Sequence, residues 1–387
     1  MSDPSTTSRS RAWVEVSLDG LRENALAVQR AVGPGVRLVP MVKADAYGLG
    51  LGAVARALAA MPALEGPWAF GVAAVAEGET LRALGWRGRT LVFAPAPHDE
   101  FHRAADAGLT LCFSDEQSVR LWAEVAAATG RDLPFHAEVD TGMGRAGFPW
   151  DRAAAWGAHV ASLARGRLRW EGVYTHFHSA DEPDLAATDR QWERFRSAVA
   201  ALPADVRTGV VVHSANSAAA LRREGLGGDL ARPGIFLYGG AAGAQQRPAP
   251  VAAVRARVVL VREVPAGWTV GYGATYTARR PERWGTLSIG YGDGIPRALS
   301  TGGGEVLVRG RRVPIIGRIS MDVTTVDLTD VPEVEVGDVA TLVGRDDPEE
   351  ITVDEAAARC GTISYEILTG LTGRLPRVYL GSEPRGF

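Results

Sequence analysis

Short apolar runs alternate with amphipathic segments along the first two thirds of the chain. A strand pattern at 12–18 and a helix pattern at 19–32 come first. Further strand patterns follow at 36–43, 68–75, 90–94, 109–114, 134–140, 168–177, 209–213 and 229–232. Helix patterns lie between them at 51–61, 76–84, 98–107, 115–129, 150–164, 185–202 and 217–223. About eight strand–helix alternations in roughly 200 residues predict parallel βα units that close into a (β/α)8 TIM-type barrel.

The pattern changes after 239–250, a stretch rich in Gly, Pro, Ala and Gln. Beyond it, strand patterns joined by Gly, Pro and Asp turns occupy 251–264, 269–274, 284–291, 305–308, 313–328 and 339–343. One helix pattern follows, with Thr352 or Asp354 as its cap. We therefore predict an α/β chain with a flexible N-terminus at 1–11, the barrel at 12–245 and a mostly-β domain at 246–387. The strand at 12–18 could join the second domain.

Composition narrows the class of protein. The chain is 46% hydrophobic and 22% charged, with a net charge of -3, so neither a nucleic-acid partner nor an anionic membrane surface is expected. No segment reaches the ~18 consecutive apolar residues of a membrane helix. The two cysteines, Cys112 and Cys360, lie far apart, which argues against a disulfide framework or a zinc site. We expect a cytoplasmic protein without a metal.

Lysine use is the strongest chemical signal. The chain has 42 Lys and Arg residues, and Lys43, which follows an apolar run, is the only lysine among them. Arginine can carry surface charge, but it cannot form a Schiff base or release a proton at working pH. Lys43 is therefore a candidate covalent catalyst. The alternative is a lysine whose stem packs at the end of a strand while its ammonium reaches water.

Polar residues follow several other strand patterns. Because the carboxyl ends of parallel strands meet at one rim of a barrel, we expect them to lie together. They are Tyr47, Arg145, His176, His213, Ser217 and Arg232. The helix start at Ser217 and the amides of Gly234 and Ile235 suit a phosphate group. A lysine beside a phosphate cradle is the minimum set for pyridoxal phosphate. Alone, Ser217 indicates a helix cap and His176 a core histidine.

The motifs resemble those of the alanine racemase family. V-K-A-D-A-Y-G at 42–48 is similar to the family's pyridoxal-lysine signature. The other matching motifs, in the family's order, are D-T-G-M-G-R-A-G, Y-T-H-F, H-S-A-N-S, A-R-P-G-I-F-L-Y-G, V-G-Y-G-A-T-Y-T-A, I-G-Y-G-D-G, G-R-I-S-M-D and T-I-S-Y-E-I-L. The resemblance extends from about residue 12 to 379. It implies a (β/α)8 barrel with a C-terminal β domain, assembled as a head-to-tail homodimer, that interconverts L- and D-alanine and supplies D-alanine.

The resemblance also implies roles for the residues that occupy the family's motifs. Lys43 holds pyridoxal 5'-phosphate through a Schiff base and is the base that faces the D-enantiomer. Tyr272, contributed by the second subunit, is the base that faces the L-enantiomer. The phosphate is bound by Tyr47, Ser217, Gly234, Ile235 and Tyr365.

Further roles concern the cofactor ring and the substrate. Arg232 contacts the pyridine nitrogen, His176 lies against the ring and Arg145 reaches its phenolic oxygen. From the second subunit, the Met321 amide binds the substrate carboxylate and Tyr291 lines the entrance. Two supporting residues complete the set, His213 and Asp322.

One position departs from the family's pattern. Many members carry a carbamylated lysine two residues before the D-T-G motif, and its carboxylate orients the arginine that corresponds to Arg145. Here that position is Glu138, and a second lysine is absent from the sequence. We expect Glu138 to supply the carboxylate directly and to pair with Arg145. The alternative is a strand-end glutamate that faces solvent.

Other functions remain open at this point. A racemase of the same fold could act on serine or on a broad range of amino acids. A barrel-type decarboxylase would share Lys43 and the cradle, but the motif around Tyr272 and the arginine at 232 speak against it. A cofactor carrier without a reaction of its own would need neither Tyr272 nor the β domain.

Overall fold

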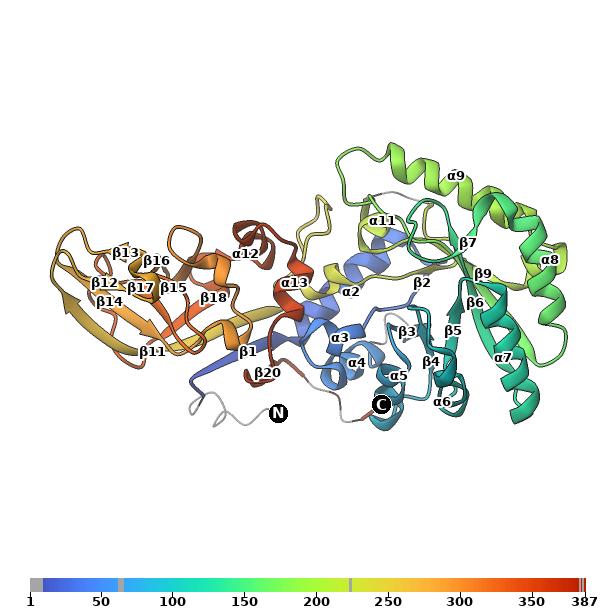
Figure 1. Cartoon of the computed structure of the whole chain (residues 1–387), viewed down its shortest axis with the longest axis horizontal. Coiled ribbons are helices and arrows are strands. Elements are labelled where there is room, and N and C mark those ends of the chain that lie inside the picture. The colour runs from blue at the N-terminus through green and yellow to red at the C-terminus, as the bar shows by residue number, and fades with distance from the viewer. Residues whose placement is uncertain (1–9, 62–65, 223–224, 383, 385) are drawn as a thin grey trace.

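The computed structural model of the 387-residue chain describes residues 10–61, 66–222, 225–382, 384 and 386–387. The first nine residues, which belong to the N-terminus predicted to be flexible, lie outside this part. Figure 1 shows two domains arranged end to end, a barrel surrounded by helices and a β domain beside it. No helix of the described residues is long and apolar enough to cross a membrane.

The barrel strands are parallel and follow one another around a closed sheet. Their order is β2-β10-β9-β8-β6-β5-β4-β3, and the short β7 (Phe148–Pro149) pairs beside β6. The bounds are β2 Arg37–Leu38, β3 Ala69–Val72, β4 Arg89–Val92, β5 Thr110–Phe113, β6 Leu133–Asp140, β8 Leu168–Tyr174, β9 Val211–His213 and β10 Leu230–Ala231. Bonds of 2.8 Å from the Val42 amide to the Gly71 carbonyl and of 2.9 Å from the Gly71 amide to the Pro40 carbonyl close the ring. The predicted (β/α)8 barrel is confirmed.

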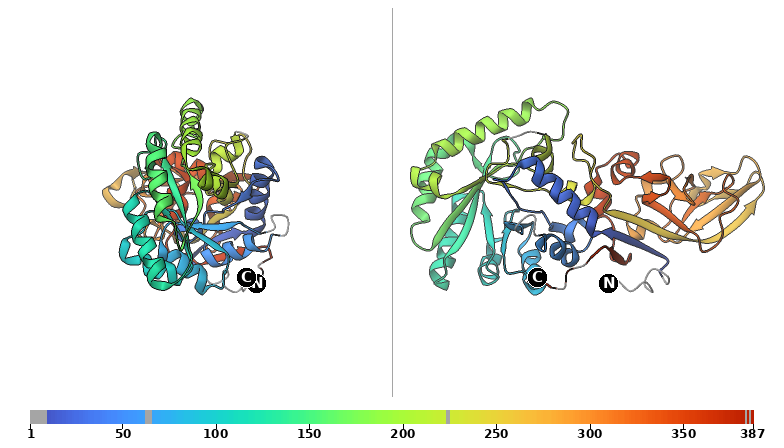
Figure 2. Two further views of the ribbon diagram at one scale, coloured as in Figure 1. Left: turned by 90° about the vertical axis from the view of Figure 1, so that its right-hand side faces the viewer. Right: turned by 180° about the vertical axis from the view of Figure 1, so that it is seen from behind.

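Helices surround these strands, as the end-on view in Figure 2 shows. Apart from α10, these helices bury an apolar stripe, as α2 does with Leu21, Ala25 and Val28. The helices are α2 Leu18–Val32, α4 Leu51–Ala59, α5 Val75–Ala83, α6 Phe101–Asp106, α7 Glu116–Thr129, α8 Ala153–Leu163, α9 Ala186–Ala201, α10 Ala204–Gly209 and α11 Ser217–Arg222. The 3₁₀ turns η2 (His98–Glu100) and η3 (Trp150–Arg152) open α6 and α8. Only the short α10, which follows Pro203, has no counterpart among the predicted helices.

The first barrel strand is shorter than its apolar pattern predicts. The strand β2 covers only Arg37 and Leu38, and a single bridge joins Met41 to Gly71. Beyond the strand, the Val39 and Met41 amides still donate to the Ala231 and Pro233 carbonyls at 2.7 and 2.9 Å. Lys43 does not end a strand, because a tight turn, α3 (Lys43–Tyr47), begins there. Ala44 to Tyr47 all have positive φ values, between 52° and 57°. The turn is therefore left-handed, a conformation that costs about 1–2 kcal/mol per residue with a Cβ atom.

The second domain is built on a twisted sheet with the order β19-β18-β15-β16-β17-β14-β11-β1-β20. The strand at the N-terminus, β1 (Ala12–Ser17), lies in this sheet, antiparallel to β11 (Ala252–Val264) and parallel to β20 (Arg377–Leu380). The remaining strands are β12 Thr269–Val270, β13 Tyr276–Thr277, β14 Glu282–Leu287, β15 Glu305–Val308, β16 Arg311–Ile316, β17 Thr324–Asp327, β18 Val339–Asp346 and β19 Glu349–Ile351. The predicted mostly-β character of this domain is confirmed.

Several predicted elements of this domain need correction. The pattern at 313–328 is two strands, β16 and β17, because the chain turns at Gly317, where φ is 67°. The strand predicted at 269–274 ends at Val270. Gly271 and Gly273 both have a φ of 74° there, and the 3₁₀ turn η5 (Tyr272–Ala274) begins directly after Gly271. The predicted helix is α12 (Val353–Cys360), capped by Thr352, and a second helix, α13 (Ser364–Thr369), follows it.

Candidate active site

A cavity of about 590 Å³ opens at the C-terminal rim of the barrel strands. Ten of the residues singled out from the sequence line it: Lys43, Tyr47, Glu138, Arg145, His176, Ser217, Arg232, Gly234, Ile235 and Tyr365. The supporting residue His213 lies buried directly behind Arg232, to which it is hydrogen-bonded. These residues bring an amine, two arginines, a carboxylate, a histidine and three hydroxyl-bearing side chains around one space, with Tyr365 contributed by α13.

Lys43 stands at the start of the left-handed turn α3. Burial and the nearby Arg145 guanidinium lower the pKa of its amine, and the Glu77 carboxylate acts in the opposite direction. A lysine with a lowered pKa has a larger neutral fraction near pH 7, as a nucleophile or a proton acceptor needs. Tyr47, at the other end of the turn, is buried and stacks on Tyr238, with ring centroids 4.5 Å apart.

Backbone amides converge beside Tyr47. The Ser217 hydroxyl oxygen accepts a hydrogen bond of 2.8 Å from the Gly234 amide. A Cβ atom on Gly234 would lie only 2.2 Å from Tyr47 Oη, so this position has room only for glycine. Ser217 is not the helix cap, because Asn216 Oδ1 accepts from the Ala219 amide at 3.0 Å and Ser217 is the first residue of α11. The Tyr47 and Ser217 hydroxyls and the backbone at Gly234 and Ile235 line one side of the cavity, and this set of groups fits a bound phosphate.

Arg232 is held from behind by a buried pair of histidines. Its Nη1 donates to His213 Nδ1 at 2.9 Å, and its Nη2 donates to the carbonyls of Thr175 and Ser214 at 2.9 and 3.1 Å. His213 Nε2 in turn lies 2.8 Å from His136 Nδ1. Burial lowers the pKa of Arg232 to about 10, so its guanidinium stays charged at neutral pH. Burial and the cations Arg232, Arg145 and Lys43 lower the pKa of His176 to about 3.

Sequence reasoning missed His136, although a signal was present. His136 and Glu138 are two residues apart on β6, so their side chains point to the same side of the sheet. Because Glu138 was expected at the barrel rim, the period of two would have placed His136 inside the barrel beneath it. Glu77, on α5, was missed as well, because a glutamate in the first turn of a helix is typical of capping.

Glu138 is buried, with 4% of its surface exposed, and it accepts a hydrogen bond of 3.0 Å from the Tyr174 hydroxyl. Burial raises the pKa of its carboxyl, whereas Tyr174, Arg145 and Arg232 act to lower it. The solvent-facing alternative is therefore wrong. Among the described residues, Glu138 and Arg145 form no ion pair: Glu138 bonds to Tyr174, and Arg145 lies exposed on the loop after β6. The two charges share the cavity without the direct contact that was expected.

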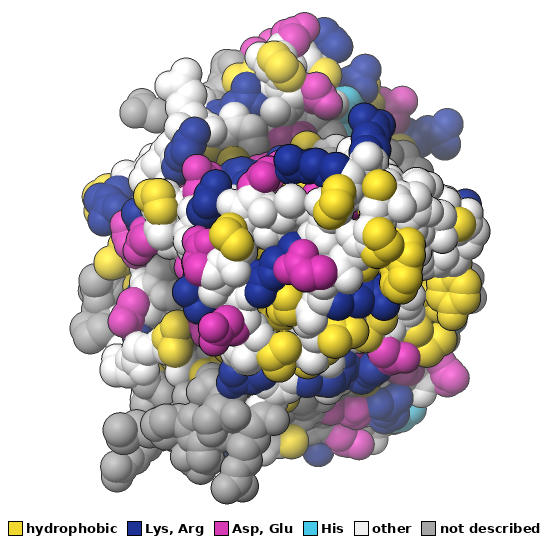
Figure 3. Space-filling view, turned by 90° about the vertical axis from the view of Figure 1, so that its left-hand side faces the viewer, with side chains coloured by type: hydrophobic (Ala, Val, Ile, Leu, Met, Phe, Trp, Pro, Cys, Tyr) yellow, Lys and Arg dark blue, Asp and Glu magenta, His cyan; other side chains and the backbone are white. Residues whose placement is uncertain are grey.

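The other predicted site residues lie on the second domain, away from this cavity. Tyr272, Met321 and Tyr291 are 66%, 51% and 41% exposed, and none belongs to the described lining. Asp322 bonds to Arg374 at 2.7 Å. Figure 3 views this domain end-on, with hydrophobic side chains between charged ones across its face. Within one chain, the candidate cofactor-binding residues therefore lie around one cavity, but Tyr272, the candidate second base, does not lie with them.

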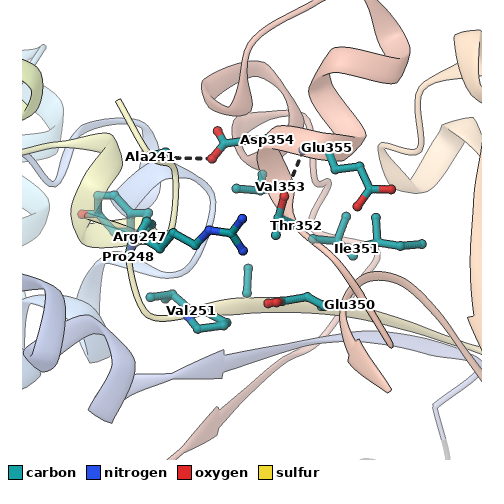
Figure 4. Close-up of a pocket in the computed structure, with 16 residues that line it drawn as sticks. Ala241, Arg247, Pro248, Val251, Glu350, Ile351, Thr352, Val353, Asp354 and Glu355 are labelled. Carbon is teal, nitrogen blue, oxygen red and sulfur yellow. Dashed lines mark hydrogen bonds between the residues drawn. The ribbon is translucent and has the colours of Figure 1, made fainter. Parts of the chain in front are cut away.

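A second cavity, of about 500 Å³, lies between the linker after Tyr238 and the start of α12 (Figure 4). Two of its acidic residues have partners: Asp354 accepts from the Ala241 amide at 2.8 Å, and Glu355 pairs with Arg312 at 2.6 Å. Arg247 reaches into the space from the linker side in Figure 4. The chemistry of the first cavity, a lysine beside a phosphate cradle, has no counterpart here.

Comparison with known proteins covers both domains. Residues 16–242 match the family model described as alanine racemase, N-terminal domain, and residues 251–379 match alanine racemase, C-terminal domain. The chain is 40% identical to the alanine racemase of Desulfosudis oleivorans, over 95% of this chain and 96% of that protein. It is 38% identical to the alanine racemase of Synechocystis sp., over 96% and 100% of the two chains.

Solved structures agree with these sequence matches. The alanine racemase from D-cycloserine-producing Streptomyces lavendulae superimposes with a TM-score of 0.87 at 35% identity, covering 96% of this chain and 98% of that one. The alanine racemase from Bartonella henselae, a structure with covalently bound pyridoxal phosphate, gives a TM-score of 0.86 at 28% identity, covering 96% and 100%.

Proposed function

Because the chain belongs to the alanine racemase family, we propose that it interconverts L-alanine and D-alanine with pyridoxal 5'-phosphate as cofactor. The observation that carries the proposal is the position of Lys43, the only lysine, in a cavity with a phosphate cradle and a buried arginine. Tyr47, Ser217, Gly234, Ile235 and Tyr365 would hold the phosphate. When bound, the cofactor makes the α-proton of an amino acid acidic by withdrawing electrons from the α-carbon.

Racemisation requires a proton to leave one face of the α-carbon and another to arrive on the opposite face. Lys43 serves the face from which D-alanine loses its proton, and its lowered pKa favours that role. Tyr272 of the partner subunit serves the opposite face. The support for this assignment is that Tyr272 sits exposed outside the cavity of its own chain. The active unit would be a head-to-tail homodimer in which each subunit completes the other's site.

Arg232 limits side reactions after proton removal. A guanidinium with a pKa of about 10 does not hand its proton to a weakly basic pyridine nitrogen near pH 7. Arg232 therefore leaves the ring nitrogen unprotonated and weakens its pull on electrons. With pyridoxal phosphate bound, this arrangement would favour return of a proton to the α-carbon over transamination or decarboxylation. His176 lies beside Arg232, with 3.5 Å between Nη2 and Nδ1, and supports the ring as a neutral side chain.

Substrate binding and entry fall to the partner in this proposal. The amide of Met321 of the partner subunit would bind the substrate carboxylate together with Arg145, and the partner's Tyr291 would line the entrance. In the chain itself, the segments that carry these residues are joined by a bond of 3.0 Å from the Tyr291 amide to the Ser320 carbonyl. Two unpaired cysteines and a D-alanine product fit an enzyme that supplies D-alanine in the cytoplasm.

Exchange of the substrate α-proton in heavy water tests this function. Purified protein with pyridoxal phosphate would be given L-alanine, D-alanine, L-serine or L-arginine, and exchange and chirality would be followed by NMR and chiral chromatography. We expect exchange with racemisation of alanine from both enantiomers. If serine or arginine turned over faster than alanine, that amino acid would be the preferred substrate. Absence of exchange with every substrate would refute the proposed function.

A further inference from the structure

Four consecutive residues after Lys43 have a left-handed backbone. The φ angles of Ala44, Asp45, Ala46 and Tyr47 are 52°, 54°, 54° and 57°, and none of these residues is glycine. Every L-residue with a Cβ atom is disfavoured in this conformation, so a run of four needs contacts that hold it. The run connects Lys43 to Tyr47, two residues that line the same cavity. Its geometry therefore decides where the amine points.

The Glu77 carboxylate supplies such a contact from the neighbouring βα unit. Its Oε1 atom accepts a hydrogen bond of 2.6 Å from the Ala44 amide. Its Oε2 atom accepts from the amides of Ala73 and Ala74 at 2.7 and 3.2 Å, at the start of α5. One oxygen thus caps the helix to which Glu77 belongs, and the other reaches across the barrel rim to the first residue after Lys43.

Most other bonds of the turn are local, although the Gly48 carbonyl at its end accepts from the Arg377 guanidinium at 2.8 Å. The Ala46 amide donates to the Val42 carbonyl at 2.9 Å, and the Gly48 amide donates to the Ala44 carbonyl at 2.8 Å. Asp45 Oδ1 accepts from the Leu51 amide at 2.7 Å. These bonds shape the turn itself. The bond of 2.8 Å from the Val42 amide to the Gly71 carbonyl ties the residue before Lys43 to β3. Glu77 adds a second tie on the other side of Lys43, at Ala44, because its other oxygen is anchored at the end of β3.

We propose that Glu77 is a positioning residue, which holds the left-handed turn against the second βα unit and thereby aims Lys43 into the cavity. The link to catalysis rests on the proposed function, but the hold on the turn does not. Electrostatics act in the same place: Glu77 raises the pKa of Lys43, against the lowering by burial and by Arg145. His176 is the other titratable group that faces Lys43.

The competing explanation is that Glu77 only caps α5, and two variants separate the two roles. Glu77→Asp keeps a carboxylate in the first turn of the helix but is one methylene too short to cap it and reach Ala44 together. Glu77→Gln keeps the length but turns an N–H₂ group toward one of the amides. Ala44→Gly removes the penalty of a positive φ at an exposed position, so it should relieve the turn of its need for Glu77.

Asp115→Ala is the matched control. Asp115 caps α7, another barrel helix, by accepting from the Ser118 amide at 2.7 Å, and it does not line the cavity. The control loses a cap of the same kind and leaves the turn untouched. Its loss of stability, measured by urea unfolding, sets the scale for a purely structural effect.

Two measurements on the full chain report the position of Lys43. The first is the dissociation constant of pyridoxal phosphate from its absorbance change on binding. The second is the NMR signal of lysine labelled with ¹³C at Cε, measured without added cofactor across a pH series. Because Lys43 is the only lysine, this signal has one source. Because this signal needs no cofactor, it tests whether Glu77 positions the turn even if the protein does not bind pyridoxal phosphate.

We expect Glu77→Asp to weaken cofactor binding about tenfold, as the loss of one hydrogen bond to a charged group would, and to shift the Lys43 signal. Glu77→Gln should also lower the pKa of Lys43, because the carboxylate that raises it is gone. Adding Ala44→Gly to Glu77→Asp should restore most of the affinity, and Asp115→Ala should change neither readout. Wild-type affinity and an unshifted signal in both Glu77 variants would overturn the proposal. The proposal would also be overturned if adding Ala44→Gly to Glu77→Asp failed to restore the affinity for pyridoxal phosphate.

Discussion

The Arg232 guanidinium donates a hydrogen bond of 2.9 Å to Nδ1 of His213, and both groups are buried. An arginine can only donate, so Nδ1 of His213 is the acceptor and the neutral ring carries its proton on Nε2. That proton points to Nδ1 of His136, 2.8 Å away. Burial and the charge of Arg232 lower the pKa of His213 well below the usual value. A second proton on His213 would sit on Nδ1, directly against the charged guanidinium of Arg232. Arg232 therefore keeps the His213 ring neutral.

Neutral buried histidines predict a loss of stability in acid. The pKa of His176 is about 3 in the folded chain, against about 6.5 in an unfolded one. The unfolded state therefore binds more protons between these values, and stability is full above pH ~6.5 and falls toward pH 3, by up to ~1.4 kcal/mol per pH unit. Urea unfolding of the wild type and His176→Phe between pH 7 and 5 measures this. Equal slopes of the unfolding free energy against pH would contradict the prediction.

Glu138→Gln separates the charge of this residue from its hydrogen bond. Glutamine still accepts from the Tyr174 hydroxyl, so the unfolding free energy should change by less than about 1 kcal/mol. The negative charge shared with Arg145 and Arg232 is lost, and we expect kcat to fall about tenfold. Tyr174→Phe is the control, because it removes the hydrogen bond and keeps the carboxylate. Wild-type turnover in Glu138→Gln would show that the carboxylate does not replace the family's carbamylated lysine.

Gly234→Ala tests the phosphate cradle. The added Cβ atom would lie 2.2 Å from Tyr47 Oη, and the Tyr47 ring cannot easily yield because it stacks on Tyr238. We expect the dissociation constant of pyridoxal phosphate to rise at least tenfold, about 1.4 kcal/mol. Gly209→Ala is a suitable control, since a Cβ atom there meets open space. Unchanged binding in Gly234→Ala would place the phosphate elsewhere.

Tyr272→Phe removes the proposed base on the face of L-alanine. Loss of a general base typically costs a factor of about 10² to 10⁴. We expect racemisation to fall by that factor, while exchange of the α-proton of D-alanine in heavy water continues through Lys43. Chiral chromatography and NMR on the same reaction mixture measure both. If α-proton exchange fell equally for L-alanine and D-alanine, Tyr272 would not be the base for the L-alanine face alone, and the assignment would be contradicted.

Much of the fold follows from periodicity alone. Apolar strand patterns separated by helix patterns predict the barrel because parallel strands require crossover helices. Most residues of the cavity could be found for the same reason, since strand ends share a rim. Lys43 is also recognisable from the sequence, because all the remaining Lys and Arg residues of the chain are arginine.

Other features depend on contacts that no local pattern carries. The left-handed turn after Lys43 contains alanines and an aspartate and no glycine, so its backbone is set by bonds such as that from the Ala44 amide to Glu77, 33 residues further along the chain. The buried position of His136 depends on its bond to His213, 77 residues away. The missing pair between Glu138 and Arg145 reflects a loop whose course the sequence does not encode locally.

Two chains build each active site in the proposed mechanism, and mixing two inactive variants tests this arrangement. Lys43→Ala lacks one base and Tyr272→Phe lacks the other. If Tyr272 acts in the partner's site, a mixed dimer contains one site with both residues intact. We predict that each variant alone racemises alanine at least about 10²-fold more slowly than the wild type and that co-expression restores much of the activity. Persistent inactivity in mixed dimers, confirmed by two different affinity tags, would place both bases in one chain and refute the shared site.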